Sequence, residues 1–408
     1  MATIFHIDGF EHGVWSSAGG GLITTIAGSG GTATIEAEAA RSGGYGLKVV
    51  TAGNSRYALQ AVPPSETVSV SVGYIRFPSL PSAEQVLLEA AFTYGANQAY
   101  ARYGLNASNE LFTDFYDSGP QTRQTRTGAI SANIWYRLEF RVNVTGTTWT
   151  IDWRAAESDG VATEQTQNVY VKGTAGTQFN GWRYGLMAGG TTTLHMDDVV
   201  ASYTSDDYPL GPVKVLGYKL EGVGTHNLDA SPSEHFFKND GSDTALTSGE
   251  TTSYQTIDDV PVDGGADYVF VQPRSGPTEP TNTWYTEYTI ENSVEGSDPL
   301  AVRGIVALLN SAAGVSNMIA KIRDGASESN IFSGDPASTT RVYKSAVFAT
   351  KPSGGGWTDA AFNALMFRFG YTADATPNPR LHTAIVESVF SVTPSAAASI
   401  MHAHRRGR

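Results

Sequence analysis

The fold is decided by the stretch YRLEFRVNV, residues 136–144, and its continuation TGTTWTIDWR, residues 145–154. Apolar and polar side chains alternate in both runs, and a period of two is the mark of an antiparallel strand with one buried face. Gly146 lies in the turn between them, so the two runs predict a β-hairpin. Arg137 and Glu139 are expected on the solvent side. The inner face, which we expect to be buried, collects Tyr136, Leu138, Phe140, Trp149, Ile151 and Trp153.

Short alternating runs of the same kind recur along the chain, separated by turns rich in Gly, Pro, Asn and Asp. Many short strands with such spacing are typical of β-sandwiches and jelly rolls. One helical turn is predicted at 358–364, with Thr358 as its N-cap. The further predicted strands are 3–10, 46–51, 68–77, 86–94, 99–105, 183–188 and 194–203, then 284–290, 302–310, 315–323, 341–349, 365–371 and 381–392.

A segment with two prolines and a glycine, Ser205–Pro212, interrupts the strand periodicity near the middle of the chain. Such a segment is typical of a domain boundary, and 408 residues are enough for two domains. We therefore predict an all-β protein with two tandem β-sandwich domains of the jelly-roll, concanavalin A-like type. The expected limits are a first domain at 1–205, a linker at 206–212, a second domain at 213–393 and a C-terminal tail at 394–408.

The composition narrows the function classes. Charged residues make up only 16% of the chain and the formal net charge is −13. An acidic surface repels phosphate, so we expect no nucleic-acid partner. The chain has no cysteine, which excludes disulfides and thiolate metal sites. The N-terminus has no basic region followed by a long apolar run, and no stretch is apolar enough for a membrane span, so we expect neither a signal peptide nor membrane insertion.

The chain offers no convincing catalytic constellation. Glu287 and Glu291 lie on one face of a predicted strand, as carboxylates do in many jelly-roll glycosidases, but their spacing is about 13 Å. Retaining glycosidases need about 5–5.5 Å between the carboxyl groups and inverting ones about 6.5–9.5 Å. A Gly-x-Ser-x-Gly motif and a phosphate-binding glycine loop are both missing. We predict that the protein is not an enzyme and assign no catalytic, cofactor-binding or metal residue.

Two other kinds of site are compatible with the sequence, as are plain structural roles for the same residues. Asp8 and Glu11 near the start and Asp197-Asp198 in a late strand would suit Ca²⁺ if the strands are neighbours, although the alternative that the acids face solvent or cap turns is favoured. The pair His402 and His404 has no thiolate partner and lies in the tail, which argues against zinc. Four tryptophans beside turns could stack on a sugar or belong to the core: Trp15, Trp182, Trp284 and Trp357.

Two sets of short motifs resemble known families. Ile7-Asp8-Gly9-Phe10-Glu11 and Met196-Asp197-Asp198-Val199-Val200 resemble the first and last strands of concanavalin A-like, laminin-G-like jelly rolls. A second set resembles a family of tailed-phage virion proteins that place such a jelly roll before another β-domain. Its motifs are Asp207-Tyr208-Pro209-Leu210-Gly211, Val215-Leu216-Gly217, Gly224-Thr225-His226-Asn227, Thr252-Ser253-Tyr254 and Ile257-Asp258-Asp259-Val260-Pro261.

The resemblance implies a non-enzymatic structural or adhesive component of the virion, as a head decoration or a tail protein. The alternative is a secreted carbohydrate-binding β-sandwich protein. The expected partners are other virion proteins, further copies of the chain as a homo-oligomer, and a glycan of the host surface; we expect no cofactor. Residues 394–401 are apolar enough to dock on a neighbour, with Arg405, Arg406 and Arg408 on an acidic surface, although a solvated tail explains them as well.

Overall fold

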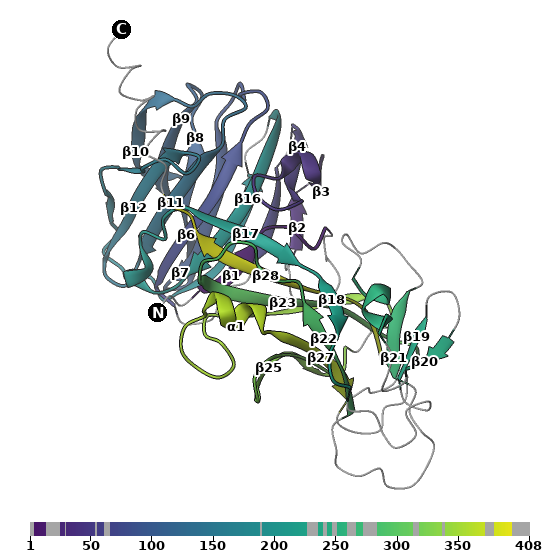
Figure 1. The fold of residues 1–408 in the computed structure, drawn as a ribbon. Coiled ribbons are helices and arrows are strands. Elements are labelled where there is room, and N and C mark those ends of the chain that lie inside the picture. Colours follow the sequence, from purple (N-terminus) through teal and green to yellow (C-terminus); the bar gives the residue numbers. More distant parts are fainter. Residues whose placement is uncertain are drawn as a thin grey trace. The chain divides into compact units, whose positions relative to one another are not determined.

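A computed structural model gives the fold of the chain (Figure 1). The structure describes residues 4–13, 25–28, 30–53, 55–60, 66–187, 190–226, 236–239, 243–246, 251–258, 267–271, 284–312, 318–336, 339–371 and 379–393. It is nearly all β, with 60% strand and 5% helix, which confirms the all-β class and the β-sandwich architecture. The described part of the chain contains no helix with the length and apolar character needed to cross a membrane.

The chain divides into two compact units, which are described one at a time. The described residues within 4–10, 25–215 and 389–393 belong to unit 1, and those within 11–13 and 216–388 belong to unit 2. The unit limits differ from the expected domain limits of 1–205 and 213–393. Each of two strands, β17 (Val213–Tyr218) and β28 (Pro379–Ser391), has residues in both units. The expected tail at 394–408 lies outside the described residues.

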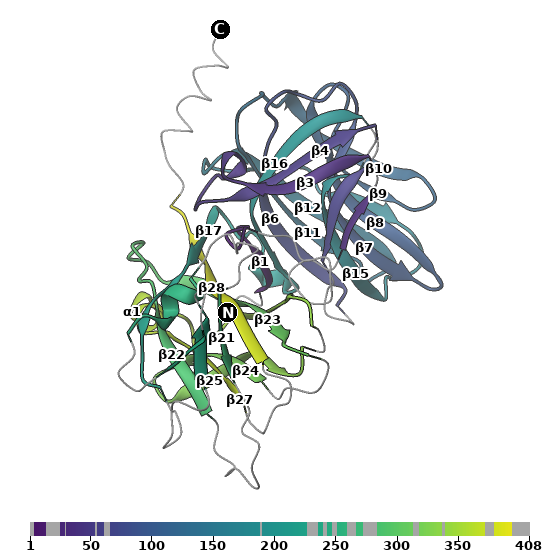
Figure 2. The same ribbon diagram turned by 90° about the vertical axis from the view of Figure 1, so that its right-hand side faces the viewer.

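Unit 1 contains two antiparallel sheets, here called sheet A and sheet B, and Figure 2 shows their strands from the side. The strand order of sheet A is β13-β12-β11-β6-β16-β4-β3, with β1 beside β16 and β14 beside β12; that of sheet B is β10-β9-β8-β7-β15-β5-β2. The strands of sheet A are β1 (Ile4–Asp8), β3 (Gly31–Glu36), β4 (Gly46–Ala52), β6 (Val68–Arg76), β11 (Tyr136–Asn143), β12 (Thr148–Glu157), β13 (Thr163–Glu164), β14 (Asn168–Val171) and β16 (Thr191–Ser202). Those of sheet B are β2 (Thr25–Gly28), β5 (Arg56–Gln60), β7 (Gln85–Tyr94), β8 (Asn97–Leu105), β9 (Glu110–Tyr116), β10 (Pro120–Ala129) and β15 (Gln178–Leu186).

The core of unit 1 lies between these sheets and is strongly aromatic. All six side chains of the predicted inner face, on β11 and β12, are at most 2% exposed, which confirms that prediction. Phe140 meets Trp182 of β15 edge to face at 4.9 Å, and Trp149 meets Phe92 of β7 at 4.8 Å. Edge-to-face pairs of this kind add to the free energy of burial, so these rings join sheet A to sheet B.

The outer face of the hairpin is less exposed than its alternation suggests. Arg137 and Glu139 were expected on the solvent side, yet both are buried and form an ion pair at 2.7 Å. The proline-containing segment lies over them, because Gly211 donates its backbone N–H to Glu139 at 3.1 Å and Arg141 lies over the Tyr208 ring. Residues of the expected linker at 206–212 therefore pack on unit 1.

Unit 2 also contains two antiparallel sheets. Over the described residues, sheet C has the order β20-β19-β21-β28-β23-β26 with β17 beside β28, and sheet D has the order β18-β22-β27-β24-β25. Sheet C adds β19 (Phe236–Asn239), β20 (Asp243–Ala245), β21 (Tyr268–Val271), β23 (Pro299–Asn310) and β26 (Val342–Phe348). Sheet D consists of β18 (Leu220–Val223), β22 (Trp284–Ile290), β24 (Met318–Asp324), β25 (Ser327–Gly334) and β27 (Met366–Tyr371). The sheets approach so closely that a Cβ at Gly304 would lie 2.4 Å from the Ile331 side chain.

The described helices are short. The α-helix α1 (Asp359–Asn363) lies where the sequence predicted a helical turn, and the Thr358 hydroxyl accepts the Ala361 backbone N–H at 3.1 Å. That bond satisfies one of the unpaired N–H groups at the helix start, so the predicted N-cap is confirmed. The remaining described helices are 3-10 turns at η1 (Ala37–Ala39), η2 (Ser205–Asp207) and η4 (Ser253–Thr256).

Candidate functional site

The candidate site is a row of charged residues that crosses the outer face of sheet B, one residue on each of five neighbouring strands. The register pairs Arg123 of β10 with Asp114 of β9, Asp114 with Arg102 of β8, Arg102 with Glu89 of β7, and Glu89 with Arg183 of β15. Charges therefore alternate in sign along the row. We call these five residues the sheet B ladder.

Strand alternation explains why the ladder faces outward. In β8 the ring of Tyr103 points to the core, where it meets Phe140 at 5.7 Å and Trp153 at 5.4 Å. Neighbouring side chains of a strand point to opposite faces, so Arg102 points away from the core. The same reasoning places Asp114 outward, because Phe115 packs on Trp149.

The ladder is tied together by short ion pairs. Arg102 donates to both oxygens of Asp114, at 2.7 Å from Nε and 2.8 Å from Nη2. Arg123 donates to Asp114 at 2.6 Å and to both oxygens of Glu84 at 2.7 and 3.0 Å, while Arg183 donates to Glu89 at 2.7 Å. Asp114 is fully buried, and its desolvation is offset by these charge-assisted bonds.

Glu89 lies at the centre of the face and is only 7% exposed. Burial raises its pKa, and the neighbouring guanidinium groups of Arg183 and Arg102 offset part of that rise. A carboxyl group with a raised pKa is a candidate for proton transfer as well as for hydrogen bonding. A role in acid–base catalysis would also require a second, accessible carboxylate close to Glu89.

Tyrosine rings border the ladder. Tyr100 of β8 and Tyr116 of β9 are cross-strand partners, and both are half-buried. Arg102 lies 4.3 Å from the centre of the Tyr116 ring, and Arg183 lies 4.9 Å from that of Tyr100. Arg183 also lies 5.4 Å from the Tyr57 ring on β5. These contacts hold the rings in place by cation–π attraction.

The row next to the ladder changes from large to small side chains. Tyr116 and Tyr100 are followed, on the next two strands in register, by Ala91 of β7 and Gly181 of β15. Ala91 is only 2% exposed and Gly181 is buried, so the accessible part of this row consists of the two half-buried rings. The exposed parts of these rings, of the three arginines and of the Glu84 carboxylate can contact a ligand that carries hydroxyl groups.

The acidic residues considered for calcium take part in ion pairs and hydrogen bonds within the protein. Asp197 and Asp198 of β16 are fully buried; Arg41 forms an ion pair with Asp198, which also accepts from Ser42 Oγ and from the Val215 backbone N–H, both at 2.6 Å. Burial, and then the charge of Asp198, raise the pKa of Asp197 well above its ordinary value. Among the described residues, no group of three potential ligands includes Asp197 or Asp198.

In unit 1, no group of three potential ligands among the described residues joins Asp8 to Asp197 and Asp198, and Glu11 belongs to unit 2. In unit 1 Asp8 accepts hydrogen bonds from the Phe10 backbone N–H at 3.0 Å and from the Tyr184 hydroxyl at 3.3 Å. The guanidinium of Arg41 is the positive charge that the structure places on Asp198. It also binds Asp159 and lies 3.5 Å from the centre of the Tyr74 ring.

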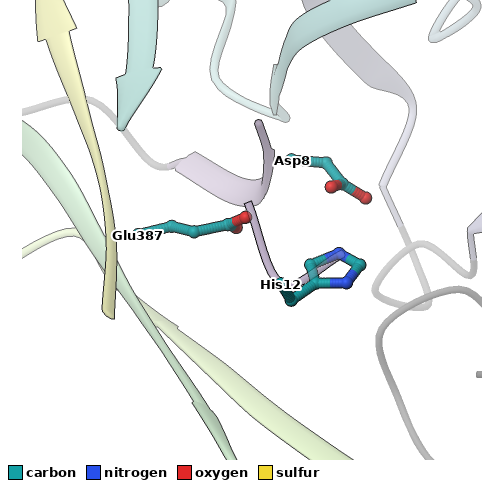
Figure 3. Close-up of side chains that lie close together, drawn as sticks. All are labelled: Asp8, His12 and Glu387. Carbon is teal, nitrogen blue, oxygen red and sulfur yellow. The ribbon is translucent and has the colours of Figure 1, made fainter. Parts of the chain in front are cut away.

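Unit 2 brings a histidine and a carboxylate together. His12 and Glu387 offer ligand atoms within 4.8 Å of each other (Figure 3). Glu387 is already the partner of buried Arg303 at 3.2 Å and of the Glu11 backbone N–H at 3.2 Å. Two protein ligands are too few for a structural cation site, and Asp8, the third residue labelled in Figure 3, belongs to unit 1. His402 and His404 lie outside the described residues.

The two glutamates examined for glycoside hydrolysis are in different surroundings. Glu287 of β22 is fully buried, and its Oε1 accepts from Arg323 at 2.5 Å and from Arg368 at 2.7 Å. Glu291 follows the end of the strand and is exposed. Glu291 is therefore exposed as expected, whereas Glu287 is buried and paired with Arg323 and Arg368.

The two candidate sugar platforms that the structure describes, Trp182 and Trp357, are too buried to stack on a sugar. Trp182 is 3% exposed and donates to the Ser69 hydroxyl at 2.9 Å, while Trp357 is 4% exposed and donates to the Phe348 carbonyl at 2.8 Å. Both are core residues, so the stacking alternative is wrong for them. Trp15 and the side chain of Trp284 lie outside the described residues.

The sheet B ladder is not apparent from the sequence alone. A weak signal is present in β8, where Tyr100 and Arg102 alternate with buried residues, but β9 shows no such alternation. The ladder is recognisable only once the register aligns strands that are far apart in the sequence.

Comparisons with known proteins give likeness of structure only. No protein-family model matches the chain, and no curated protein sequence matches it. Among solved structures, the chain is similar to the cellulose-induced protein Cip1, with 18% identity and a TM-score of 0.35 over 48% of this chain and 97% of Cip1. It is similar to the catalytic domain of a glycoside hydrolase family 131 protein from Coprinopsis cinerea, with 13% identity and a TM-score of 0.29 over 42% of this chain and 78% of that one.

A third similar structure is the C-terminal family 22 carbohydrate-binding module of Xyn10B from Clostridium thermocellum. It has 15% identity and a TM-score of 0.26 over 50% of this chain and 94% of the module. At such identities and scores these likenesses say nothing about what this chain binds.

Proposed function

We propose that the protein is a non-enzymatic adhesive component of a tailed-phage virion that holds a glycan on the outer face of sheet B. The observation that carries the proposal is the sheet B ladder with Tyr57, Tyr100 and Tyr116 beside it. Tyrosine rings can stack on the apolar face of a sugar, while the ladder supplies donors and acceptors for its hydroxyl groups.

The charge balance of the face favours a neutral ligand. Its three arginines, Arg102, Arg123 and Arg183, face three carboxylates, Glu84, Glu89 and Asp114, so the formal charges cancel. A polyhydroxylated ligand can bind to such a face by hydrogen bonds and stacking, without a net charge of its own. A strongly anionic polymer gains little from a surface whose cations are already paired.

The ion pairs argue against glycoside hydrolysis. That reaction needs a carboxylic acid and a second carboxylate that acts as base or nucleophile. Glu89 could supply the acid, but both oxygens of Asp114 accept guanidinium N–H groups and the residue has no solvent exposure. A carboxylate held in this way is poorly placed to activate water.

The virion setting rests on the resemblance of the motifs at 207–211, 215–217 and 224–227 to tailed-phage virion proteins. Mass spectrometry of purified particles tests it directly, because a virion component must co-purify with capsid and tail proteins in a fixed copy number. Recovery of the chain only from the culture medium would instead favour the alternative, a secreted carbohydrate-binding protein.

Glycan binding is tested by a glycan array with the full chain, followed by affinity measurement on the best ligand. Tyr100→Leu and Tyr116→Leu should each weaken binding about three- to tenfold, the loss expected for one aromatic stacking contact. Tyr203→Leu is the matched control, because Tyr203 is half-buried in unit 1 but follows β16 of sheet A. Unchanged affinity in both ladder-side variants would refute the assignment to this face.

The non-enzymatic part has its own test. Purified protein is incubated with the bound glycan and the products are separated by chromatography. We expect no cleavage. Hydrolysis that is lost in Glu89→Gln would show an enzyme centred on the ladder, and hydrolysis lost in Glu287→Gln would place the reaction in unit 2.

A further inference from the structure

A small pocket opens on the outer face of sheet D in unit 2. It has a volume of about 70 Å³ and is lined by Tyr285, Ile319, Lys321, Glu328 and Arg368. The register explains the hollow, because Gly370 of β27 lies between Tyr285 of β22 and Ile319 of β24. A glycine between two larger cross-strand neighbours leaves the space that a side chain would fill.

The pocket wall carries an excess of positive charge. Lys321 and Arg368 are direct cross-strand partners, an arrangement of like charges that is unfavourable unless acids compensate it. Glu328 binds both, at 2.8 Å from Lys321, and Glu287 binds Arg368 and Arg323. Three cations therefore face two carboxylates, which leaves one positive charge on a chain whose formal net charge is −13.

The two cations of the pocket have donors to spare. Within the described residues, Arg368 uses Nε and Nη1 in hydrogen bonds but not Nη2, and Lys321 uses one of its three N–H bonds. Tyr285 contributes an aromatic surface, since Arg368 lies 3.8 Å from the centre of its ring and the residue is half-buried. Donors, an uncompensated charge and a ring thus meet at one hollow.

We propose that this pocket binds the carboxylate of an acidic sugar. The volume suits a group of a few heavy atoms, and a carboxylate accepts hydrogen bonds from Lys321 and Arg368 together. The half-buried Tyr285 ring can contact the sugar that carries the group, which favours a uronic acid over an acidic protein side chain. This site lies in unit 2 and does not depend on glycan binding by sheet B.

The probe is sodium glucuronate, titrated into the full chain by isothermal calorimetry with glucose and acetate as comparison ligands. We expect glucuronate to bind more tightly than either, and added salt to weaken it. Lys321→Gln should weaken glucuronate binding about tenfold, because it removes one charge-assisted hydrogen bond. Gly370→Ala should weaken glucuronate binding at least as much, because the added methyl group would occupy the space between Tyr285 and Ile319 without changing any charge.

Gly356→Ala is the matched control, because a Cβ at Gly356 meets nothing within 4 Å. Tyr100→Leu should leave glucuronate binding unchanged, which separates this site from the one proposed on sheet B. Equal affinity for glucose, or unchanged binding in Lys321→Gln, would overturn the proposal. Acetate bound as tightly as glucuronate would overturn the sugar requirement and favour a carboxylate from a protein. Lys321 is partly exposed, so its variant tests the proposal even if Gly370→Ala does not fold.

Discussion

Replacement of Arg41 by methionine should destabilise unit 1 strongly. Arg41 is 7% exposed at its side chain and is the guanidinium partner of fully buried Asp198. Methionine keeps much of the volume but removes the charge, which leaves Asp198 with the hydrogen bonds from the Ser42 hydroxyl and the Val215 backbone N–H. Removal of one partner of a buried ion pair costs about 3–5 kcal/mol of the free energy of unfolding, because the other charge remains buried.

The loss should depend on pH. Without Arg41, the carboxyl of Asp198 avoids the cost of a buried charge by taking up a proton, so the variant recovers stability as the pH falls. Urea unfolding at pH 7.5 and pH 5, followed by tryptophan fluorescence, measures the difference between the variant and the parent. We expect the difference to be clearly smaller at pH 5.

The control is Lys48→Met, whose ion pairs with Glu36 and Glu38 lie at the surface. Its effect should stay below about 1 kcal/mol. Arg41→Lys keeps a charge but not the planar fork and should fall between the two. A loss below about 1 kcal/mol in Arg41→Met, or an equal loss at both pH values, would refute the assignment of Arg41 as the counter-charge of Asp198.

Three further predictions concern stability. Phe140→Ala removes a fully buried ring that meets Trp182 and should cost about 3–5 kcal/mol in urea melts, and a cost below about 1 kcal/mol would contradict the core assignment. Burial, and then the charge of Arg76, lower the pKa of His195 to about 4. Because the folded state favours neutral His195, the contribution of this residue to the free energy of unfolding is complete above about pH 6.5 and is lost as the pH falls towards 4. His195→Asn should therefore flatten the dependence of Tm on pH between these values. An unchanged profile would argue against this role. Thr358→Ala removes the N-cap of α1 and should cost about 1 kcal/mol in unit 2, whereas Thr358→Ser should be nearly neutral; equal effects of the two would show that the cap contributes little.

The sequence predicts well those elements whose pattern is local. The hairpin at 136–154 could be assigned from alternation alone, and its register in the structure pairs Phe140 with Trp153 and Val142 with Ile151. The helix start at Thr358 was predictable for the same reason, since a cap and its first turn are adjacent residues. In these elements each side chain meets neighbours that the sequence already places beside it.

Elements without a local pattern were missed. The strand β10 runs from Pro120 to Ala129 and contains no large apolar side chain, so it lacks the alternation that identifies a half-buried strand. The tryptophans at 182 and 357 were considered as platforms because they lie beside turns, although a large ring next to a turn can still point inward. Position relative to a turn does not determine the direction of a side chain, which depends on the phase of the strand.

The sheet B ladder could not be predicted because it depends on register between strands that are distant in sequence. Arg183 lies 94 residues from its partner Glu89, and nothing near either residue indicates the other. The alternating charges become a single row only when β15, β7, β8, β9 and β10 are aligned. The same is true of the pocket on sheet D, whose hollow results from the alignment of Gly370 with Tyr285 and Ile319.

The ladder also explains why this register is favoured over others. A shift of β8 by one residue would turn Arg102 towards the aromatic core and Tyr103 towards solvent. Burial of an unpaired guanidinium in the core would cost far more than the lost ring contacts, so ladder residues penalise the alternative pairing. The pairing that satisfies Glu89, Arg102 and Asp114 also fixes the positions of Tyr100 and Tyr116. The rings proposed to hold a glycan are thus set by the same ion pairs that specify the sheet, and little side-chain freedom remains to be lost when a ligand binds.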